Sequence, residues 1–428
     1  MDTPDTQAGN EQAADTADKP VASTDRIGSL DFIRGIAVMG ILAANIVAFG
    51  QPFQAYMYPD AFLTGHDDSS NWMWIVQFIL VDGKMRGLFT LLFGAGMYLF
   101  LERAWARGSG IPLQARRLGW LLLFGLVHFF LIWRGDILVL YALSGFAALL
   151  FVKLKAKTQM HLGILGYIAG GLVYALLFGP LYFVAETPLG KNVAFVELAE
   201  ALGEAKALEI ADGVSEAAII QNGSWFDFVG HNFAVHGLDP FSMIFVFAFE
   251  TVPLILLGMA LYRMGLFSGG FAPGRQRMWG WIGLIGGTLV TIPIALWGAS
   301  TGPSYWGSLA ALTAFSFLPR LPVVVGLAAL LALWGAHANG WLGRRIKAAG
   351  RAAFTNYLGT SILMLFVFHG WAGGLYGELN RPQLYIVVAS TWVLMLLWSK
   401  PWLDRFRFGP LEWLWRCLTY GERFPLKR

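Results

Sequence analysis

The chain has 428 residues, of which 56% are hydrophobic and only 14% are charged. A soluble domain carries about a quarter charged residues, so this composition excludes that class and predicts a polytopic membrane protein. The 18 tryptophans and 33 phenylalanines fit aromatic anchoring at both membrane interfaces. A single cysteine, Cys417, excludes an intramolecular disulfide and a cysteine-cluster metal site. The net charge of +4 does not indicate a nucleic-acid partner, because the basic residues lie in short loops.

The chain begins with an acidic, polar stretch, residues 1–25, which has no apolar period and is predicted to be a disordered tail. Residues 26–428 are predicted to form a single integral-membrane domain. The opening helix does not resemble a signal peptide, because it lacks a basic region before it and an A-x-A-like cleavage site after it. We therefore interpret it as a permanent first span.

Apolar stretches of about twenty residues, the length that a bilayer requires, predict an all-α bundle of about ten transmembrane helices. The predicted spans are 31–50, 86–103, 117–133, 137–153, 162–184, 241–263, 279–298, 320–338, 353–371 and 383–400. With ten spans the basic loops all fall on one side, which the positive-inside rule makes cytoplasmic. Both termini are then cytoplasmic, as expected for a multi-pass protein of a bacterial inner membrane.

Three further segments are not predicted to span. Residues 72–85 are expected to form a half-inserted or interfacial helix that is interrupted at Asp82-Gly83-Lys84. The acidic loop 185–240 is predicted to lie outside, and its run VAFVELAEALGEAKALEI has a helical pattern. The C-terminal segment 401–428 places aromatic residues beside Arg416, as an interfacial helix does.

The first span contains three polar residues that membrane burial makes costly: Asp31, Arg34 and Asn45. Arg34 lies about one turn into the helix, and Asn45 is about 16 Å further along the axis, near the outer face. Asp31 and Arg34 can form a local ion pair, and Asn45 can simply bond a neighbouring helix. The alternative is that all three belong to a functional site.

A second polar group contains His128, Asp136 and Tyr141, which flank the tight turn Trp133-Arg134-Gly135. Antiparallel helices joined by this turn place His128 and Tyr141 at similar depth. An imidazole near a carboxylate can act as a general base with an oriented tautomer. Asp136 can instead serve only as the N-cap of the following helix, and both interpretations remain open.

A third polar group lies in GRAAFTNYLGTS, residues 350–361, where Asn356 and Tyr357 are the strongest signals. His369 follows near the outer end of that span, and Glu250 lies inside another span, where it must be paired or protonated. His66, in TGHDDSSNW, lies in the first outer loop. The sequence has no metal-ligand spacing typical of zinc, no P-loop and no G-x-S-x-G motif, so we expect no metal.

A resemblance to a known family rests on six stretches: LDFIRGIAVMGILAANI, GLFTLLFGAGMYLF, HFFLIWRGDILVLYALSG, FETVPLILLGMALYRMG, GRAAFTNYLGTS and GPLEWLWRCLTYG. Together they resemble the bacterial YeiB-like family, known as domain of unknown function 418. That family is similar to larger groups of transmembrane acyltransferases, including the acyltransferase-3 enzymes and heparan-alpha-glucosaminide N-acetyltransferase. The resemblance implies transfer of an acyl group from cytoplasmic acyl-CoA to an acceptor on the other side.

The resemblance also bears on the site residues. Acyltransferase-3 proteins have an arginine, ten residues and then a histidine in the first span, whereas this chain has Asn45 at that spacing from Arg34. The glucosaminide enzyme likewise has asparagine there and a histidine in the following outer loop, for which His66 is the nearest counterpart. The base must therefore lie on another segment than the first span.

The sequence leads to two functional hypotheses. In the first, a membrane-bound acyltransferase binds the phosphates of acyl-CoA through Arg34 and the loop residues Arg116 and Arg117. His66 or His128 is then the base, Asp136 orients it, and Asn45 or Tyr141 donates to the oxyanion; the acceptor is an extracytoplasmic hydroxyl or amine. The alternative is a permease for a small solute, which uses intramembrane charges for coupling. The acyl group, the acceptor and the oligomeric state stay open.

Overall fold

The computed structural model describes residues 27–65 and 68–428, and its regular elements there are helical apart from one isolated bridge between Phe406 and Lys427. The α-helices are α2 (Gly28–Gly50), α3 (Asp68–Leu80), α4 (Lys84–Trp105), α5 (Ile111–Leu131), α6 (Leu138–Leu149), α7 (Ala156–Glu186), α8 (Val196–Asn222), α9 (Trp225–Val235), α10 (Asp239–Arg263), α11 (Pro273–Ser300), α12 (Tyr305–Leu309), α13 (Phe317–His337), α14 (Trp341–Arg351), α15 (Ala353–Phe368), α16 (Arg381–Arg405) and α17 (Pro410–Tyr420). The prediction of an all-helical fold is confirmed.

Six of the described helices are long and apolar enough to cross a bilayer: α2, α7, α10, α11, α13 and α16. The pair α14 and α15, bent by 83° at its junction, makes a seventh candidate. This pattern is that of a multi-pass membrane protein. The other three predicted spans correspond to α4, α5 and α6, and α6 has only 12 residues, which is too short to cross alone.

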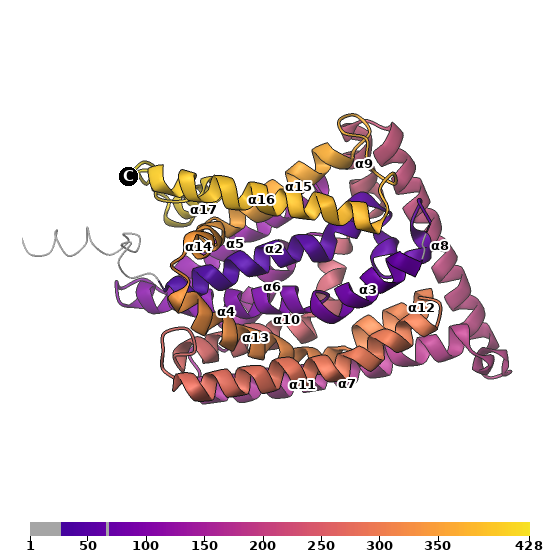
Figure 1. Cartoon of the computed structure of the whole chain (residues 1–428), viewed down its shortest axis with the longest axis horizontal. Coiled ribbons are helices and arrows are strands. Elements are labelled where there is room, and N and C mark those ends of the chain that lie inside the picture. Colours follow the sequence, from indigo (N-terminus) through magenta and orange to yellow (C-terminus); the bar gives the residue numbers. More distant parts are fainter. Residues whose placement is uncertain (1–26, 66–67) are drawn as a thin grey trace, which may run out of the picture.

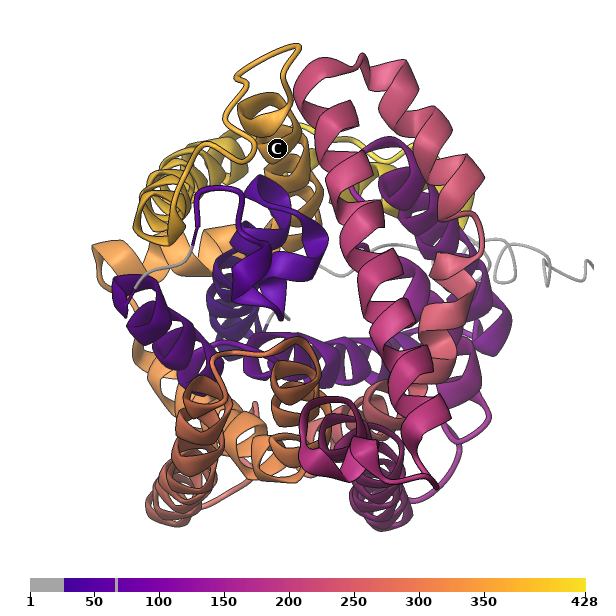
Figure 2. The ribbon, with the colours of Figure 1, turned by 90° about the vertical axis from the view of Figure 1, so that its right-hand side faces the viewer.

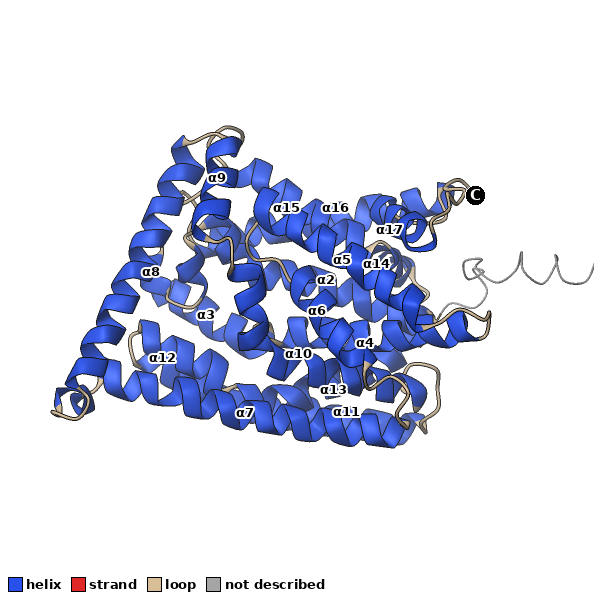
Figure 3. Cartoon of the chain, turned by 180° about the vertical axis from the view of Figure 1, so that it is seen from behind, coloured by secondary structure: helices blue, strands red, loops and turns tan. Residues whose placement is uncertain are grey.

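Most helices run along one common direction, and α2 lies in the middle of them (Figure 1). Among the six membrane-length helices α2 is the most buried, and it contacts α4, α13, α14, α15 and α16. One end of the bundle carries α14, α17 and the C-terminus, and the opposite end carries α8, α9 and α12 (Figures 1 and 3). The predicted helical run in loop 185–240 is α8, which crosses the end of the bundle that faces the viewer in Figure 2.

The interruption predicted within residues 72–85 coincides with the break between α3 and α4. Gly83 has φ +70°, a left-handed conformation that glycine adopts without steric cost. Asp82 is buried beside the break, where it accepts hydrogen bonds from Gln77 at 3.0 Å and Tyr56 at 3.2 Å. With 13 residues, α3 is shorter than a bilayer crossing.

At the end of the bundle that carries α14 and α17, helix α14 crosses close over α2. A Cβ atom at Gly350 would come within 1.8 Å of the Asp31 carbonyl oxygen, and one at Gly35 within 2.2 Å of the Ile346 carbonyl oxygen. Only glycine allows the two backbones to approach this closely. The crossing brings the end of α14 and the start of α15 against the first turns of α2.

The last helix, α17, is fixed to the start of α15 by one carboxylate. Glu412 accepts hydrogen bonds from the backbone N–H groups of Phe354 at 2.7 Å and Thr355 at 3.0 Å, and from the Thr355 hydroxyl at 2.5 Å. These N–H groups belong to the first turn of α15 and have no partner within the helix. The predicted interfacial segment is thus docked on the bundle by an N-terminal cap supplied from another helix.

Candidate functional site

A cavity of about 320 Å³, here called the basic cavity, lies at the end of the bundle that carries α14 and α17. Its volume falls in the range of small-molecule binding sites. Six arginines line it: Arg34, Arg103, Arg107, Arg117, Arg351 and Arg416. The lining contains two carboxylates, Asp31 and Glu412, and the second of these is occupied by the cap of α15. The cavity is therefore strongly positive.

The walls of the basic cavity change character with depth. The arginines come mostly from helix ends and from α17, whereas helix interiors supply apolar groups such as Phe89, Leu92, Phe93 and Leu121. Two tyrosines, Tyr141 of α6 and Tyr357 of α15, also line it, and both are buried. A ligand with an anionic head and an apolar tail matches this arrangement.

The arginines predicted to bind a cofactor differ in their positions. The Arg117 guanidinium lies between two rings, with its Cζ 4.6 Å from the Phe100 ring and 4.3 Å from the Trp415 ring. Arg34 lines the cavity and also forms the predicted i,i+3 ion pair with Asp31 at 3.4 Å. Arg116 is exposed, points toward the turn at Gly421 and does not line the cavity.

His128 of α5 and Asp136, which precedes α6, form a buried dyad. Nδ1 of His128 lies 2.7 Å from Oδ1 of Asp136, and Oδ2 of Asp136 accepts the backbone N–H of Val139 at 2.8 Å. Asp136 therefore caps α6 and also contacts the imidazole, so the cap does not exclude the other interpretation; the role of His128 as a base stays a prediction. With Nδ1–H donated to Asp136, Nε2 carries a lone pair, and this buried atom has no hydrogen-bond partner.

Tyr357 connects the dyad to the basic cavity. Its ring centroid lies 5.2 Å from that of His128, and its hydroxyl accepts the backbone N–H of Ile137 at 3.2 Å. That bond leaves the hydroxyl proton of Tyr357 available for donation. Tyr141 differs, because its hydroxyl donates to the Arg86 carbonyl oxygen at 3.2 Å and also contacts the Thr90 hydroxyl at 2.8 Å.

Two much smaller cavities continue from Tyr357 toward the opposite end. The middle cavity, of about 10 Å³, is lined by Asn45, Tyr357, Thr360 and Ser361 among others. The outer cavity, of about 20 Å³, is lined by Arg134, Glu216, His369 and Tyr376 among others. Each is about the size of one water molecule. Because Tyr357 lines the first two cavities, and Phe49 and Trp133 line the last two, the three form a row beside α2.

Phe49 and Trp133 separate the middle cavity from the outer one. Their rings are stacked with centroids 3.9 Å apart, and Nε1 of Trp133 donates to the Ala48 carbonyl oxygen at 3.2 Å. The Trp133 ring also lies 6.3 Å from that of His128. The dyad is thus flanked by Tyr357 on one side and by this stacked pair on the other.

Other predicted site residues have structural partners. The Asn356 amide donates to the Ala349 carbonyl oxygen at 3.0 Å and to Ser399 at 3.2 Å, and it accepts from Trp398 at 2.9 Å, so it joins α15 to α14 and α16. Glu250 is paired with Arg320 at 3.0 Å and with Arg86. His66 lies outside the described residues.

Sequence reasoning missed several residues that the fold brings to these sites. Among them are Arg103, Arg107 and Arg351, for which no role was predicted, and Arg416, which was predicted only to belong to an interfacial helix. A possible metal-ligand group, Asp212 with His231 and His236, was also missed. The prediction that the sequence has no zinc-like spacing was wrong here, because the two histidines are five positions apart, within the range seen in zinc sites.

Comparison with known proteins assigns the chain to a family. A family model described as "Protein of unknown function (DUF418)" matches residues 261–422. The chain is 31% identical to the uncharacterized protein YeiB of Escherichia coli (strain K12), over 94% of this chain and 98% of that protein. The chain belongs to the YeiB family.

A second member, the uncharacterized protein YxaH of Bacillus subtilis (strain 168), is 29% identical over 96% of this chain and 98% of its own length. A third relative, an uncharacterized 39.9 kDa protein in the amylase 3' region of Bacillus acidopullulyticus, is 28% identical over 95% of this chain and 97% of its own length. No solved structure matches the chain. The family assignment therefore rests on relatives that match nearly the full chain.

Proposed function

We propose that this protein is a membrane-bound acyltransferase that takes an acyl group from acyl-CoA at the basic cavity and passes it to a hydroxyl or amine acceptor. One observation carries the proposal: an arginine-lined cavity leads, through Tyr357, to a buried imidazole with an oriented tautomer and a free lone pair. Guanidinium groups match phosphates bidentately, and the apolar interior suits a pantetheine arm and its acyl group.

The proposal includes a membrane orientation. Both termini and the basic cavity face the cytoplasm of a bacterial inner membrane, and α4, α5 and α6 complete about ten crossings. The basic loops support this side, because positive residues accumulate on the cytoplasmic face. The short α6 is compatible with a crossing, since the non-helical turn before it is buried in protein through Trp133, Arg134 and Asp136.

The chemistry assigned to the dyad is general base catalysis. The acceptor oxygen or nitrogen attacks the thioester carbonyl while His128 Nε2 takes its proton. The carbon–sulfur bond then breaks, and the imidazolium returns the proton to the departing CoA thiolate. Asp136 holds the tautomer and stabilises the imidazolium, as an orienting carboxylate does.

Oxyanion stabilisation is assigned to Tyr357, whose hydroxyl proton is not engaged, and Asn45 of the middle cavity is a second donor. Tyr141 is a weaker candidate, because its hydroxyl already donates to the backbone of α4. The role of His66 in the first outer loop stays a prediction.

The test begins with binding. Purified protein in detergent is melted with acetyl-CoA, a long-chain acyl-CoA or CoA-free small solutes. A rise in melting temperature with acyl-CoA supports the proposal, and stabilisation by a small solute alone contradicts it. Turnover is then followed as release of the free CoA thiol, with amines and sugars as acceptors. If His128→Gln and His66→Ala both retain full activity, neither residue is the base.

Transport of a small solute is the second candidate, and two buried ionic groups favour it. Glu250 pairs with Arg86 and Arg320, and the buried Arg381 donates to Gln77 at 2.9 Å close to Asp82. Acyl transfer does not use these charges, whereas transporters couple through them. Solute uptake by proteoliposomes without acyl-CoA, lost in Glu250→Gln, would favour transport over acyl transfer.

A further inference from the structure

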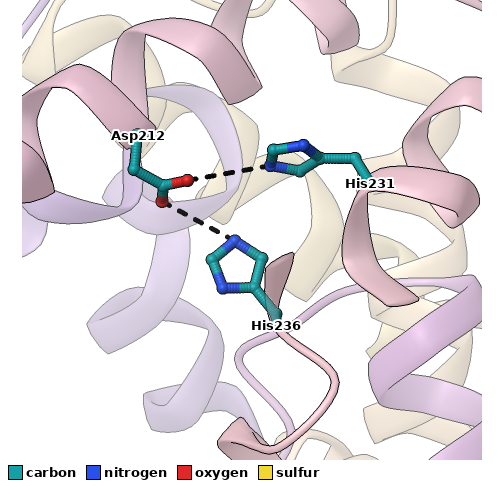
Figure 4. Close-up of side chains that lie close together, drawn as sticks. All are labelled: Asp212, His231 and His236. Carbon is teal, nitrogen blue, oxygen red and sulfur yellow. Dashed lines mark ion pairs between the residues drawn. The ribbon is translucent and has the colours of Figure 1, made fainter. Parts of the chain in front are cut away.

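A group of metal-ligating side chains lies at the end of the bundle opposite the basic cavity. Asp212 is in α8, His231 is in α9, and His236 is the residue that ends α9 (Figure 4). One ligand atom from each lies within 4.8 Å of the others. The Oδ1 of Asp212 is 3.8 Å from His231 Nε2, and its Oδ2 is 3.6 Å from His236 Nε2.

These distances favour a shared ion over direct bonding. Nitrogen–oxygen hydrogen bonds have separations of about 2.7–3.2 Å, so neither contact is one. Ligands bound to zinc at about 2.0–2.2 Å in a tetrahedron lie roughly 3.4 Å from one another. The observed spacings of Asp212 to each imidazole need only small side-chain movements to reach that geometry.

The two imidazoles differ in how their ring nitrogens are bonded. Nδ1 of His236 lies 2.9 Å from a carboxylate oxygen of Asp239, which fixes the tautomer so that Nε2 carries the lone pair. Metal-bound histidines usually have such a carboxylate on the other nitrogen. His231 Nε2 is buried without a hydrogen-bond partner, and only 10% of that side chain is exposed. This nitrogen points toward Asp212, and a dashed line in Figure 4 marks their contact at 3.8 Å.

The charges around the group suit a cation despite one nearby arginine. Arg134 lies 3.9 Å from Asp212 Oδ2 and 3.4 Å from His236 Nε2. Its charge is balanced by Glu216, which it contacts at 2.6 Å. Asp212 and Asp239 then leave the surroundings negative, and a metal replaces the long contacts that Asp212 and His236 make with Arg134 and with each other.

We propose that Asp212, His231 and His236 form a binding site for a divalent transition-metal ion, with Zn²⁺ as the best match. Two imidazoles and one carboxylate are the ligand types of zinc, and imidazole disfavours Mg²⁺ and Ca²⁺. Three protein ligands leave a fourth position for water. The ion joins α8 to α9. This inference does not depend on the acyltransferase assignment.

The experiment measures metal content of the full chain, purified in detergent without a polyhistidine tag, stripped with chelator and dialysed against Zn²⁺. We expect about one zinc per chain in the wild type and a loss of at least tenfold in affinity in His231→Ala and Asp212→Asn. His337→Ala is the matched control, since His337 is exposed and bonds only the Leu333 carbonyl oxygen. Equal zinc in the wild type and His231→Ala, or an equal loss in His337→Ala, overturns the proposal.

A second measurement distinguishes ligation from misfolding. In His231→Cys the thiolate can replace the imidazole as a ligand, so Co²⁺ bound to this variant should show the thiolate-to-cobalt absorption that the wild type lacks. Zn²⁺ should raise the melting temperature of the wild type and of His337→Ala but not of His231→Ala. Absence of the thiolate band in folded His231→Cys contradicts ligation at this position.

Discussion

Two buried ionic groups differ in what their atoms are free to do. In the first, the Glu250 carboxylate is bonded by Arg320 and Arg86, and Arg320 also donates to the Leu312 carbonyl oxygen at 2.8 Å. Glu250 lines none of the three cavities, and neither does His128 itself, which is connected to them only through the neighbouring rings of Tyr357 and Trp133. In the second, Asp136 is equally bonded, but its partner His128 retains an unbonded ring nitrogen between residues that line the cavities. Both oxygens of Glu250 are bonded, which suits a structural role, whereas the free lone pair of His128 suits chemistry.

The largest effect is expected from His128→Gln, which keeps a polar side chain of similar size but cannot act as a base. Acyl transfer should fall by about 10²–10⁴-fold, because general base catalysis contributes that much. The melting temperature should change little. Release of the CoA thiol by purified protein checks the first expectation. A variant that keeps wild-type turnover would remove His128 from the mechanism.

Glu250→Ala tests the structural role inferred for the ion pairs of Glu250 with Arg86 and Arg320. It leaves Arg86 and Arg320 without their buried carboxylate, which should destabilise the protein by about 3–5 kcal/mol. Chemical denaturation in detergent measures this loss. The folded fraction should retain acyl transfer, in contrast to His128→Gln. A stable but inactive Glu250→Ala protein would instead place Glu250 in the functional path.

Asp136→Asn separates orientation from capping. The amide oxygen can still accept the Val139 N–H, so α6 keeps its cap. The neutral amide, however, neither fixes the tautomer of His128 nor stabilises its imidazolium form. Turnover should fall by about tenfold or more with stability nearly unchanged. In Asp136→Ala the cap is lost too, which should cost about 1 kcal/mol in addition. Full activity of both variants would show that the dyad is only a helix cap.

Replacing one cavity arginine should weaken acyl-CoA binding without abolishing it. Charge-assisted hydrogen bonds are worth about 1.5–3 kcal/mol, so Arg117→Ala or Arg34→Ala should raise the Kd roughly 10–100-fold. Arg116→Ala is the control, because Arg116 is exposed outside the cavity. Titration calorimetry with acyl-CoA measures the three. Equal losses in all three variants would indicate general surface charge and not this cavity.

The smallest effect concerns the cap of α15. Burial raises the pKa of the Glu412 carboxyl above its usual range, although hydrogen bonds from Thr355 and Phe354 act against the rise. The folded state then holds its proton to higher pH than the unfolded state, so stability should fall as pH rises between the two pKa values. Glu412→Gln should flatten that slope in denaturation at several pH values. If Glu412→Gln leaves that slope unchanged, the pH dependence of stability arises from another residue.

The local features of this fold were predictable because they depend on neighbouring residues. The WRG turn is short, so it forces His128 and Asp136 to the same place, and the break at Gly83 follows from a glycine between charged residues. The bent pair α14 and α15 was not predictable in the same way, because its angle depends on the contact of Gly350 with α2.

The candidate site was predictable only in part, because some of its residues are brought together by contacts between distant parts of the sequence. Arg34 and Arg117 could be proposed from their place at the ends of predicted spans. Arg416 reaches the cavity because Glu412 ties α17 to the start of α15, more than fifty positions earlier in the chain. Arg351, at the end of α14, reaches it because α14 crosses α2 closely at Gly350. Asp212 meets His231 and His236 only after α8 and α9 fold back on each other, so periodicity along either helix gives no sign of it.

The stacked rings of Phe49 and Trp133 have a consequence for the energetics of the cell. A protein with water-sized spaces in a row from one face toward the other is at risk of conducting protons and dissipating the gradient across its membrane. Two large apolar rings in contact at 3.9 Å leave no continuous chain of water between the middle and outer cavities. We therefore expect the pair to block proton movement between the two cavities, and under the proposed function a substrate that crossed there would have to part the rings.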